Sequence, residues 1–546
     1  MLTPWSNGIV LMSLGDYNQG RARPRACSTE PQSRVPVRES CADAKRNTRA
    51  PSWGFTIEPK FSRTRLAGLA AGPVVFTAVL LAPLPTLSWE AQALVAVYVW
   101  AVLYWITEAL PVPVTAVMSS VLAVVLGVAP ARTVFSSYGD PVIFLFLGSF
   151  MLAEAMRATG LDRRFAFAVL GLAWATRSPG RLLATMGIVT CFISLWVSNT
   201  ATTAIMLPIG QGMLASLGLA ALPGNSRYPI GFMLMLTWSS SVAVGLPVAS
   251  PPNLIAIGML EDLAGQRLTF FDWVLVTMPL TVLMLALCWL LLHWRYPSPA
   301  GVRFNVSSYV ASGRAELGPW TRAQWNVAAV FALAAVFWML PGAVAAFFGA
   351  ETGAAVWLEA HLPESAVALI AAVLLFALPV DLRRGEFTLS WERAVRIDWG
   401  TILLFGGGLA LGRLTFDTGL AELVGNELVR LTGAESVWAL TAVAIVVGVA
   451  LSELSSNTAS ASAVIPIFIA ISASTGVSPV PPVLGAALGA SFGFMLPIST
   501  PPNAIVYGSG LVPLREMVRS GIWLDLSGAV LIWAGLRVLC PLFGVM

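Results

Sequence analysis

The chain has 546 residues, of which 57% are hydrophobic and only 11% are charged. Soluble domains carry charge on about a quarter of their residues, so this composition excludes an ordinary soluble protein. Apolar stretches of about 20 residues, the length needed to cross a bilayer, occur at 91–110, 274–293 and 327–348. The sequence therefore predicts an all-α polytopic membrane protein embedded in a lipid bilayer.

The net charge of +4 comes from the first 66 residues, which hold eleven Lys and Arg against five Asp and Glu. Because the remainder is close to neutral, the charge indicates no nucleic-acid partner. Residues 1–64 show little hydrophobic periodicity, and we expect a basic, disordered N-terminal tail there. Two alternatives stay open for this tail: a start codon assigned too early, and a transit peptide.

Apolar segments follow the tail at short spacing, and Pro and Gly mark the breaks between them. These segments lie near 65–84, 91–109, 112–128, 141–158, 164–175, 182–218, 229–260, 273–293, 325–348, 365–380, 399–415, 437–472, 482–512 and 520–543. Two loops, 295–322 and 381–398, are basic, and two apolar segments separate them. An even number of crossings places both loops on one side, which the positive-inside bias makes cytoplasmic.

Three unlike motifs occur twice in the same order. DPVIFLFLGSFMLAEAMRATGL and DWGTILLFGGGLALGRLTFDTGL begin at Asp140 and Asp398, 258 residues apart. The Ser-Asn-Thr triplets begin at Ser198 and Ser456, again 258 apart. ASPPNLIAIG and STPPNAIVYG contain the third pair, two Pro-Pro-Asn turns 250 residues apart. Three collinear pairs indicate an internal repeat.

The repeat divides the chain into two membrane units. We place the first at 65–294 and the second at 325–546, with a cytoplasmic loop at 295–324 between them. Inverted-topology repeats are common in secondary transporters, so we expect the two units to be inverted structural repeats.

Each Ser-Asn-Thr triplet interrupts strongly apolar sequence and is followed by a fresh helical pattern. Ser, Asn and Thr are strong N-cap residues, which predicts a broken helix at each triplet. The helix that ends there exposes carbonyl groups, which attract cations, and the helix that begins there exposes N–H groups, which attract anions. Such backbone is tolerated at membrane depth only beside protein or a water-filled cavity.

The two Pro-Pro-Asn turns act in a similar way, because prolines interrupt a helix and free upstream carbonyls. Ser250 and Thr500 place hydroxyl oxygens just before these turns. No Asp or Glu lies within the triplets or the turns, so no carboxylate of these motifs would neutralise a bound cation. An anion bound alone would also be costly at this depth in the membrane. Mutual compensation predicts a symmetric pocket in which a cation and an anion bind cooperatively, which is the thermodynamic basis of symport.

An enzyme is not expected, because the apolar segments offer neither a nucleophile with a base nor a His, Asp or Glu metal cluster. Glu108, Glu154 and Glu453 are further intramembrane candidates for function. For Glu108 and Glu453 the favoured interpretation is a structural carboxylate that faces backbone or Arg.

At these residues the sequence resembles the divalent anion–sodium symporter family, which includes sodium-coupled dicarboxylate, citrate and sulfate transporters. The resemblance covers 65–546 and rests on SNTATTAIMLPI, SNTASASAVIPI, STPPNAIVYG and the two glycine-bearing segments. It implies a homodimer in which each protomer combines a scaffold with an elevator-type transport domain. It also implies broken helices and two re-entrant hairpins, which we place near 140–160 and 398–419 and extend through the two triplets.

Carried over by motif, the resemblance assigns ligands in each half. The first sodium site would use Ser194, Ser198, Asn199 and the backbone at Ala249, and the second Ser452, Ser455, Asn457 and the backbone at Ser499. The anion would meet Asn199, Thr200, Asn457, Thr458, Thr500 and Pro501.

The spacing within the assigned sets leads to one further expectation and one departure. Ser194 stands four residues before Ser198, and the second half repeats this spacing, so each pair is expected on one helical face. Ala249 stands where the family has glycine, and Pro247 is added. The first cation site is thus the less regular copy.

The leading hypothesis is sodium-driven uptake of a C4-dicarboxylate such as succinate, malate or fumarate, with Na+ as the co-transported ion. The alternatives are a sodium-independent dicarboxylate exchanger, a sodium/sulfate symporter, and a related transporter of arsenite or another inorganic anion. We expect a multi-pass protein of the bacterial inner membrane with a cytoplasmic N-terminus.

Overall fold

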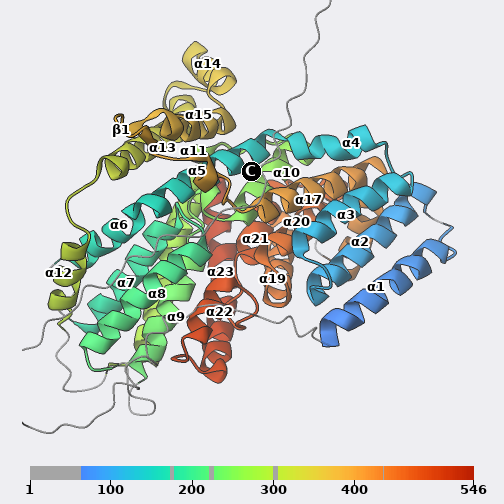
Figure 1. Cartoon of the computed structure of the whole chain (residues 1–546). Coiled ribbons are helices and arrows are strands. Elements are labelled where there is room, and N and C mark those ends of the chain that lie inside the picture. The colour runs from blue at the N-terminus through green and yellow to red at the C-terminus, as the bar shows by residue number, and fades with distance from the viewer. Residues whose placement is uncertain (1–62, 86, 173–177, 220–226, 299–304, 434–435) are drawn as a thin grey trace, which may run out of the picture. The chain divides into compact units, whose positions relative to one another are not determined.

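The structure is a computed structural model that describes residues 63–85, 87–172, 178–219, 227–298, 305–433 and 436–546. These residues form α-helices joined by short connections, together with a two-stranded antiparallel ribbon (Figure 1). The predicted all-α class is confirmed for them. The expected N-terminal tail lies outside the described residues, apart from its last two positions.

The first half of the described chain contains eleven helices and two 3-10 turns. They are Arg63–Leu81 (α1), Trp89–Thr107 (α2), Val112–Val125 (α3), Ala131–Ser136 (α4), Ser137–Gly139 (η1), Pro141–Thr159 (α5), Leu161–Leu170 (α6), Pro179–Ser194 (α7), Asn199–Ser216 (α8), Tyr228–Ser241 (α9), Pro247–Ala249 (η2), Pro251–Ala264 (α10) and Phe270–Arg295 (α11).

The second half begins with a short helix inside the expected cytoplasmic loop. Its elements are Ser307–Glu316 (α12), Arg322–Phe348 (α13), Gly353–His361 (α14), Glu364–Ala377 (α15), Pro379–Asp381 (β1), Glu386–Phe387 (β2), Trp391–Ala394 (α16), Trp399–Asp417 (α17), Leu420–Thr432 (α18), Val437–Leu454 (α19), Asn457–Thr475 (α20), Val480–Ala490 (α21), Pro501–Gly508 (α22) and Leu514–Leu542 (α23).

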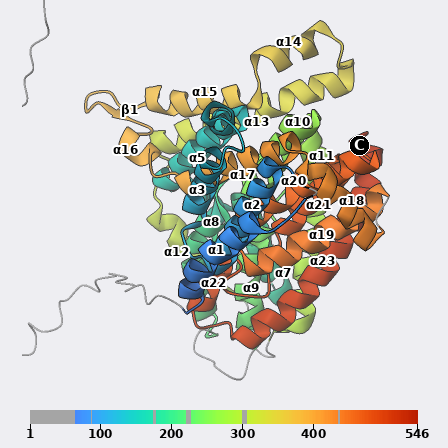
Figure 2. The same cartoon turned by 90° about the vertical axis from the view of Figure 1, so that its right-hand side faces the viewer.

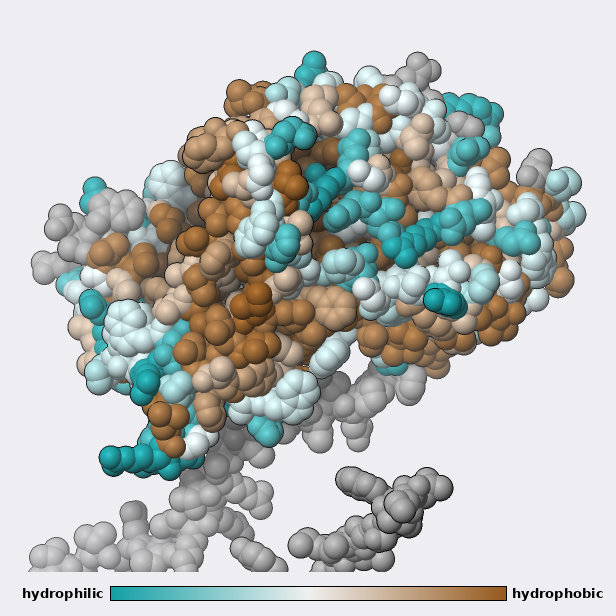
Figure 3. All heavy atoms as spheres, turned by 90° about the horizontal axis from the view of Figure 1, so that it is seen from above, coloured by the Kyte–Doolittle hydropathy of each residue, from teal (hydrophilic) through white to brown (hydrophobic). Residues whose placement is uncertain are grey.

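The helices have the length and surface of membrane-spanning elements. Within the described ranges, nine are long and apolar enough to cross a membrane, and the pair α14–α15, bent by 57°, makes ten if it forms one broken span. Large apolar side chains such as Val282, Leu290 and Val530 are exposed on them. Seen from above, hydrophilic side chains form a band between apolar areas (Figure 3). Exposed apolar surface of this extent is stable in lipid rather than in water, so the protein is an integral, multi-pass membrane protein.

The order of helices follows the duplicated motifs. Helices α5 to α11 contain, in sequence, a long helix, a short helix, a helix pair joined at Ser-Asn-Thr, a helix pair joined at Pro-Pro-Asn, and a final long helix. Helices α17 to α23 repeat this series. Helices α10, α17 and α20 lie side by side in both views (Figures 1 and 2) and contact one another.

The hairpins expected near 140–160 and 398–419 are not formed at those positions. Both segments are single unbroken helices of 19 residues, α5 and α17. The glycines serve close packing instead, since a Cβ on Gly148 would lie 2.5 Å from the backbone of Ala368 in α15. The breaks at the triplets instead separate α7 from α8 and α19 from α20.

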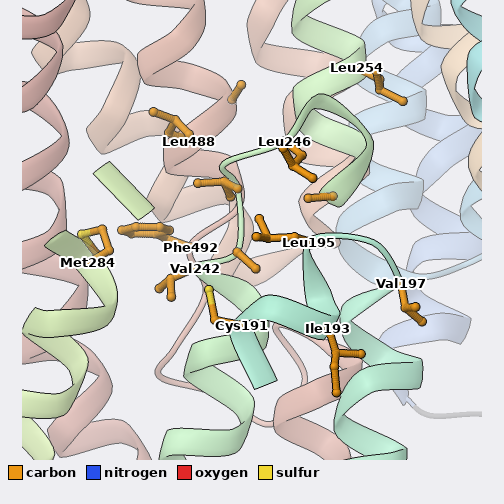
Figure 4. Close-up of a cluster of buried hydrophobic side chains, with 14 of the residues drawn as sticks. Cys191, Ile193, Leu195, Val197, Val242, Leu246, Leu254, Met284, Leu488 and Phe492 are labelled. Atoms are coloured by element: carbon orange, nitrogen blue, oxygen red, sulfur yellow. The ribbon is translucent and has the colours of Figure 1, made fainter. Parts of the chain in front are cut away.

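The helix breaks lie within the largest apolar core of the described chain. Leu195 follows α7, and Val242 and Leu246 follow α9. Figure 4 shows these three buried side chains gathered where the chain leaves helical form. Packing by apolar side chains holds the non-helical segments in place, so their polar groups can be directed to one side.

Candidate functional site

The first helix break lies between α7 and α8. α7 ends at Ser194, a short turn follows, and Ser198 caps α8 by accepting a hydrogen bond from Ala201 N–H at 3.4 Å. The buried Ser194 Oγ lies 2.7 Å from Asn199 Oδ1 and 3.0 Å from the carbonyl oxygen of Ser240. The predicted N-cap is confirmed. The expectation that Ser194 and Ser198 share one helical face is wrong, because the chain turns between them.

The second break, between α19 and α20, repeats this network. Ser456 caps α20. Ser452 Oγ lies 2.7 Å from Asn457 Oδ1 and 2.8 Å from the carbonyl oxygen of Ala490. Asn457 Nδ2 also donates to the Ser491 carbonyl at 3.3 Å. The sequence repeat is therefore also a repeat of hydrogen bonds.

The asparagine of each Pro-Pro-Asn turn holds the non-helical segment that precedes it. Asn503 Nδ2 donates to the carbonyls of Gly493 (2.8 Å) and Leu496 (3.0 Å), and its Oδ1 accepts from Thr237 Oγ1 at 2.6 Å. Because Thr237 belongs to α9, this last bond joins the two halves. Sequence reasoning considered the prolines and hydroxyls of these turns and missed the asparagines, although both turns carry one at the same place.

Replacement of Asn503 by alanine is expected to lower the free energy of unfolding by about 2–3 kcal/mol, because three buried hydrogen bonds are lost and Thr237 loses its acceptor. Asn253→Ala is the matched control, since Asn253 donates to Val244 and Leu246 in the same way while its Oδ1 has no partner in the described chain. We expect a smaller loss for Asn253→Ala, measured by thermal unfolding of the purified proteins. Equal losses would contradict the role of the bond to Thr237.

The breaks and the turns face one cavity of about 650 Å³. All six residues predicted to meet the anion line it: Asn199, Thr200, Asn457, Thr458, Thr500 and Pro501. Of the residues predicted to bind sodium, Ser198, Asn199, Ala249, Asn457 and Ser499 line it, whereas Ser194, Ser452 and Ser455 do not. The structure thus brings the motifs of both halves together at one site.

Two of the residues outside the lining support it from behind. Ser194 and Ser452 are fully buried and hold Oδ1 of Asn199 and Asn457, respectively. The side-chain N–H groups of Asn199, and the one N–H of Asn457 that does not donate to Ser491, are therefore available toward the cavity. Ser455 directly follows α19, and its buried hydroxyl has no partner among the described residues.

Four charged side chains also line the cavity, namely Glu154, Arg157, Arg396 and Asp398. Arg157 forms a bidentate ion pair with Glu154, at 2.8 and 2.9 Å. Asp398 caps α17 by accepting hydrogen bonds from the backbone N–H (3.2 Å) and the hydroxyl (2.6 Å) of Thr401. Two guanidinium groups and two carboxylates sum to a formal charge of zero, so the lining itself does not neutralise an anion.

Glu453 marks the main difference between the two halves. It is only 3% exposed, and its carboxylate accepts hydrogen bonds from Ser499 Oγ (2.6 Å) and Met495 N–H (2.9 Å). At the matching positions (453 − 258 and 499 − 250) the first half has Leu195 and Ala249. The second half therefore places a carboxylate beside its predicted cation ligands, and the first half places apolar groups there.

The three glutamates considered from sequence have different surroundings. Glu154 lines the cavity, Glu453 lies behind it, and Glu108 ends α2 in a left-handed conformation (φ 48°), outside the lining. Asp525 of α23 lies beside Glu453. Its sequence surroundings did not mark it, because the approach of α23 depends on tertiary packing.

Apolar helices around a cavity lined by duplicated helix breaks define the class of secondary membrane transporters. A family model described as the sodium:sulfate symporter transmembrane region matches residues 63–543. The chain belongs to this family, whose co-transported ion is sodium, and the family resemblance inferred from the motifs is confirmed.

Similar proteins agree with this assignment. The sodium-dependent dicarboxylate transporter SdcS of Staphylococcus aureus (strain bovine RF122 / ET3-1) is 31% identical over 488 residues, which are 86% of this chain and 90% of the relative. SdcS of strain MRSA252 is 30% identical over the same length. The crystal structure of the Alcanivorax borkumensis YdaH transporter has a TM-score of 0.51 and 17% identity, covering 73% of this chain and 86% of that one. This last likeness supports the fold alone.

Proposed function

We propose that the protein carries a C4-dicarboxylate such as succinate, malate or fumarate across the membrane together with sodium ions. The observation that carries this proposal is the cavity in which two Ser-Asn-Thr breaks and two Pro-Pro-Asn turns meet, while its charged side chains sum to zero. The similar proteins named sodium-dependent dicarboxylate transporters support the substrate class.

The two halves suit an anion with a carboxylate at each end. Asn199 and Thr200 offer an amide and a hydroxyl from one half, and Asn457 and Thr458 offer the same groups from the other. Such neutral donors bind carboxylate oxygens, and each asparagine oxygen, which already accepts from a serine hydroxyl, has a second lone pair that could face a cation. One carboxylate would therefore bind in each half, with the sodium ions beside them.

Charge explains why the two ligands travel together. A divalent anion in a lining of zero net charge, at membrane depth, is costly unless cations enter with it. Two sodium ions, one in each predicted site, would offset a dicarboxylate completely. Each ligand then raises the affinity for the other, and this reciprocal coupling links transport to the sodium gradient.

The proposal includes an elevator motion in a homodimer whose two repeats are inverted, in a bacterial plasma membrane with the N-terminus in the cytoplasm. Helices α7–α11 and α19–α23 would move as one unit against the other helices. Contacts that tie this unit together support the division: Arg227 pairs with Glu516 of α23 at 2.8 Å, and Thr237 donates to Asn503.

The direct test is uptake of radiolabelled succinate into proteoliposomes. An inward sodium gradient is expected to raise the initial rate roughly tenfold or more over an equal choline gradient, in line with typical coupling energies. Excess unlabelled malate should compete, whereas sulfate should not. Uptake that does not depend on sodium but requires succinate inside the vesicles would indicate an exchanger instead of a symporter. Competition by sulfate would indicate that sulfate, rather than a dicarboxylate, is the substrate.

A further inference from the structure

We infer that Glu453 supplies the negative charge that sets the sodium affinity of the second cation site, so that the two sodium sites differ. The inference rests on the proposed function for the identity of the cation. It adds a positioning residue that the ligand sets of that function do not contain.

The geometry identifies Glu453 as a carboxylate bonded to a predicted ligand. Oε2 accepts from the hydroxyl of Ser499, and Oε1 accepts from Met495 N–H. Both oxygens of the Glu453 carboxylate are thus fixed in place by neighbouring donors. The charge therefore lies next to the segment that carries the predicted backbone ligand at Ser499.

The same charge is close to the other ligands of the second site. A Cβ built on Gly493 would lie 3.1 Å from Ser499 Cβ and 3.2 Å from Ser452 Oγ, so both serines pack around this glycine. Glu453 directly follows Ser452 in the chain. A sodium ion among these groups would lie within a few ångströms of the carboxylate, and burial strengthens their attraction.

The first half shows that a carboxylate is not needed to hold such a segment. There the matching segment is held by neutral side chains that donate to its carbonyls: Trp273 Nε1 donates to Val244 (3.1 Å) and Thr277 Oγ1 to Gly245 (3.3 Å). Because uncharged groups fix the loop of one half, the shape of the loop alone does not explain the charge in the other.

Among the described residues, the titratable neighbour of Glu453 is another acid rather than a cation. Asp525, the titratable neighbour from α23, is a second carboxyl group. No Arg or Lys in the described part of the chain forms an ion pair with either of them. A buried carboxylate without a counter-ion is strongly disfavoured, and a sodium ion at the second site would supply the missing charge.

The test replaces the charge while keeping the shape. Glu453→Gln retains an acceptor for Ser499, and sodium binding is measured on the purified protein, without substrate, as the rise in unfolding temperature with sodium concentration. We expect the sodium concentration that gives half of the effect to increase roughly tenfold, whereas the KM for succinate at saturating sodium changes less than about twofold. An unchanged sodium midpoint would overturn the inference.

Two further variants separate the charge from folding effects. Glu108→Gln removes an exposed carboxylate outside the cavity and is expected to leave the sodium midpoint unchanged. If Glu453→Gln does not fold, Glu453→Leu with Ser499→Ala copies Leu195 and Ala249 of the first half and leaves no serine hydroxyl unpaired; it should show the same increase. Sodium that stabilises the wild type without driving uptake would refute the proposed symport and leave this inference intact.

Discussion

Replacing Asn457 with alanine is expected to lower sodium-driven succinate uptake by roughly two orders of magnitude. The side chain accepts from Ser452 and donates to the Ser491 carbonyl, and it lines the cavity where a carboxylate would bind. Loss of two or three such hydrogen bonds amounts to about 3 kcal/mol, or roughly a hundredfold in binding. Initial rates at fixed sodium and succinate concentrations measure the effect.

Asn326→Ala is the matched control for this substitution. Asn326 in α13 also makes two hydrogen bonds, to the carbonyl of Pro379 (3.3 Å) and to Thr388 Oγ1 (2.8 Å), but it does not line the cavity. The control should lose comparable stability and keep uptake within about twofold of the wild type. Uptake at the wild-type rate by the Asn457 variant would refute the anion site.

The sequence predicts the helix breaks well because they depend on local chemistry. Ser198 and Ser456 cap α8 and α20 as their residue types indicate. The repeat offset also pairs the correct residues, since Asn199 and Asn457 form equivalent bonds with serines five residues earlier. Capping is decided by residues that are neighbours in the chain, so a single sequence contains the necessary information.

The hairpin positions that the family resemblance implies for the glycine-bearing segments are wrong, and glycine alone does not indicate a break because it has two opposite uses in helices. It weakens helices as a local breaker, but it also lets two helices approach closely. A Cβ on Gly407 of α17 would lie 2.8 Å from the carbonyl oxygen of Ala116 in α3, so this glycine serves packing within an unbroken helix. Which use applies depends on a neighbour almost 300 residues away, and the local pattern does not reveal it.

The partners that complete the site are also distant in the chain. Thr237 meets Asn503, and Glu453 meets Ser499, across 266 and 46 residues. The ion pair in which the charges of Glu154 and Arg157 cancel, by contrast, follows from their spacing of three residues on one helix. Sequence reasoning therefore finds the motifs of the cavity, and the structure adds the contacts that orient them and the charge balance around them.

An ion pair links the unit proposed to move with the helices proposed to stay. Arg413 of α17 binds Asp262 of α10 through two hydrogen bonds, and both side chains are partly buried. This ion pair is distant from the cavity end of α17. Asp398, which lines the cavity and caps α17, precedes Arg413 by 15 residues, which is about 22 Å along the helix axis. Sliding of α10 along α17 would pull this ion pair apart.

Cross-linking positions 262 and 413 is therefore expected to abolish succinate uptake. The variant Asp262→Cys with Arg413→Cys, in a background with Cys27 and Cys41 replaced by serine, would be joined by a short bifunctional thiol reagent with a reducible linker. The other three cysteines, Cys191, Cys288 and Cys540, are buried. Uptake should stop when the link forms and return when a reductant cleaves it, because an elevator cannot move while α10 is fixed to α17.

The control is a link between elements that would move together. Arg227 and Glu516 form an ion pair between the start of α9 and α23, both within the proposed moving unit. Cysteines at these two positions, joined by the same reagent, should leave uptake within about twofold of the unlinked protein, because rigid-body motion leaves distances inside a unit unchanged. Full uptake by the linked 262–413 protein would refute the elevator, whereas loss of uptake in both linked proteins would show that the boundary between the units is drawn wrongly.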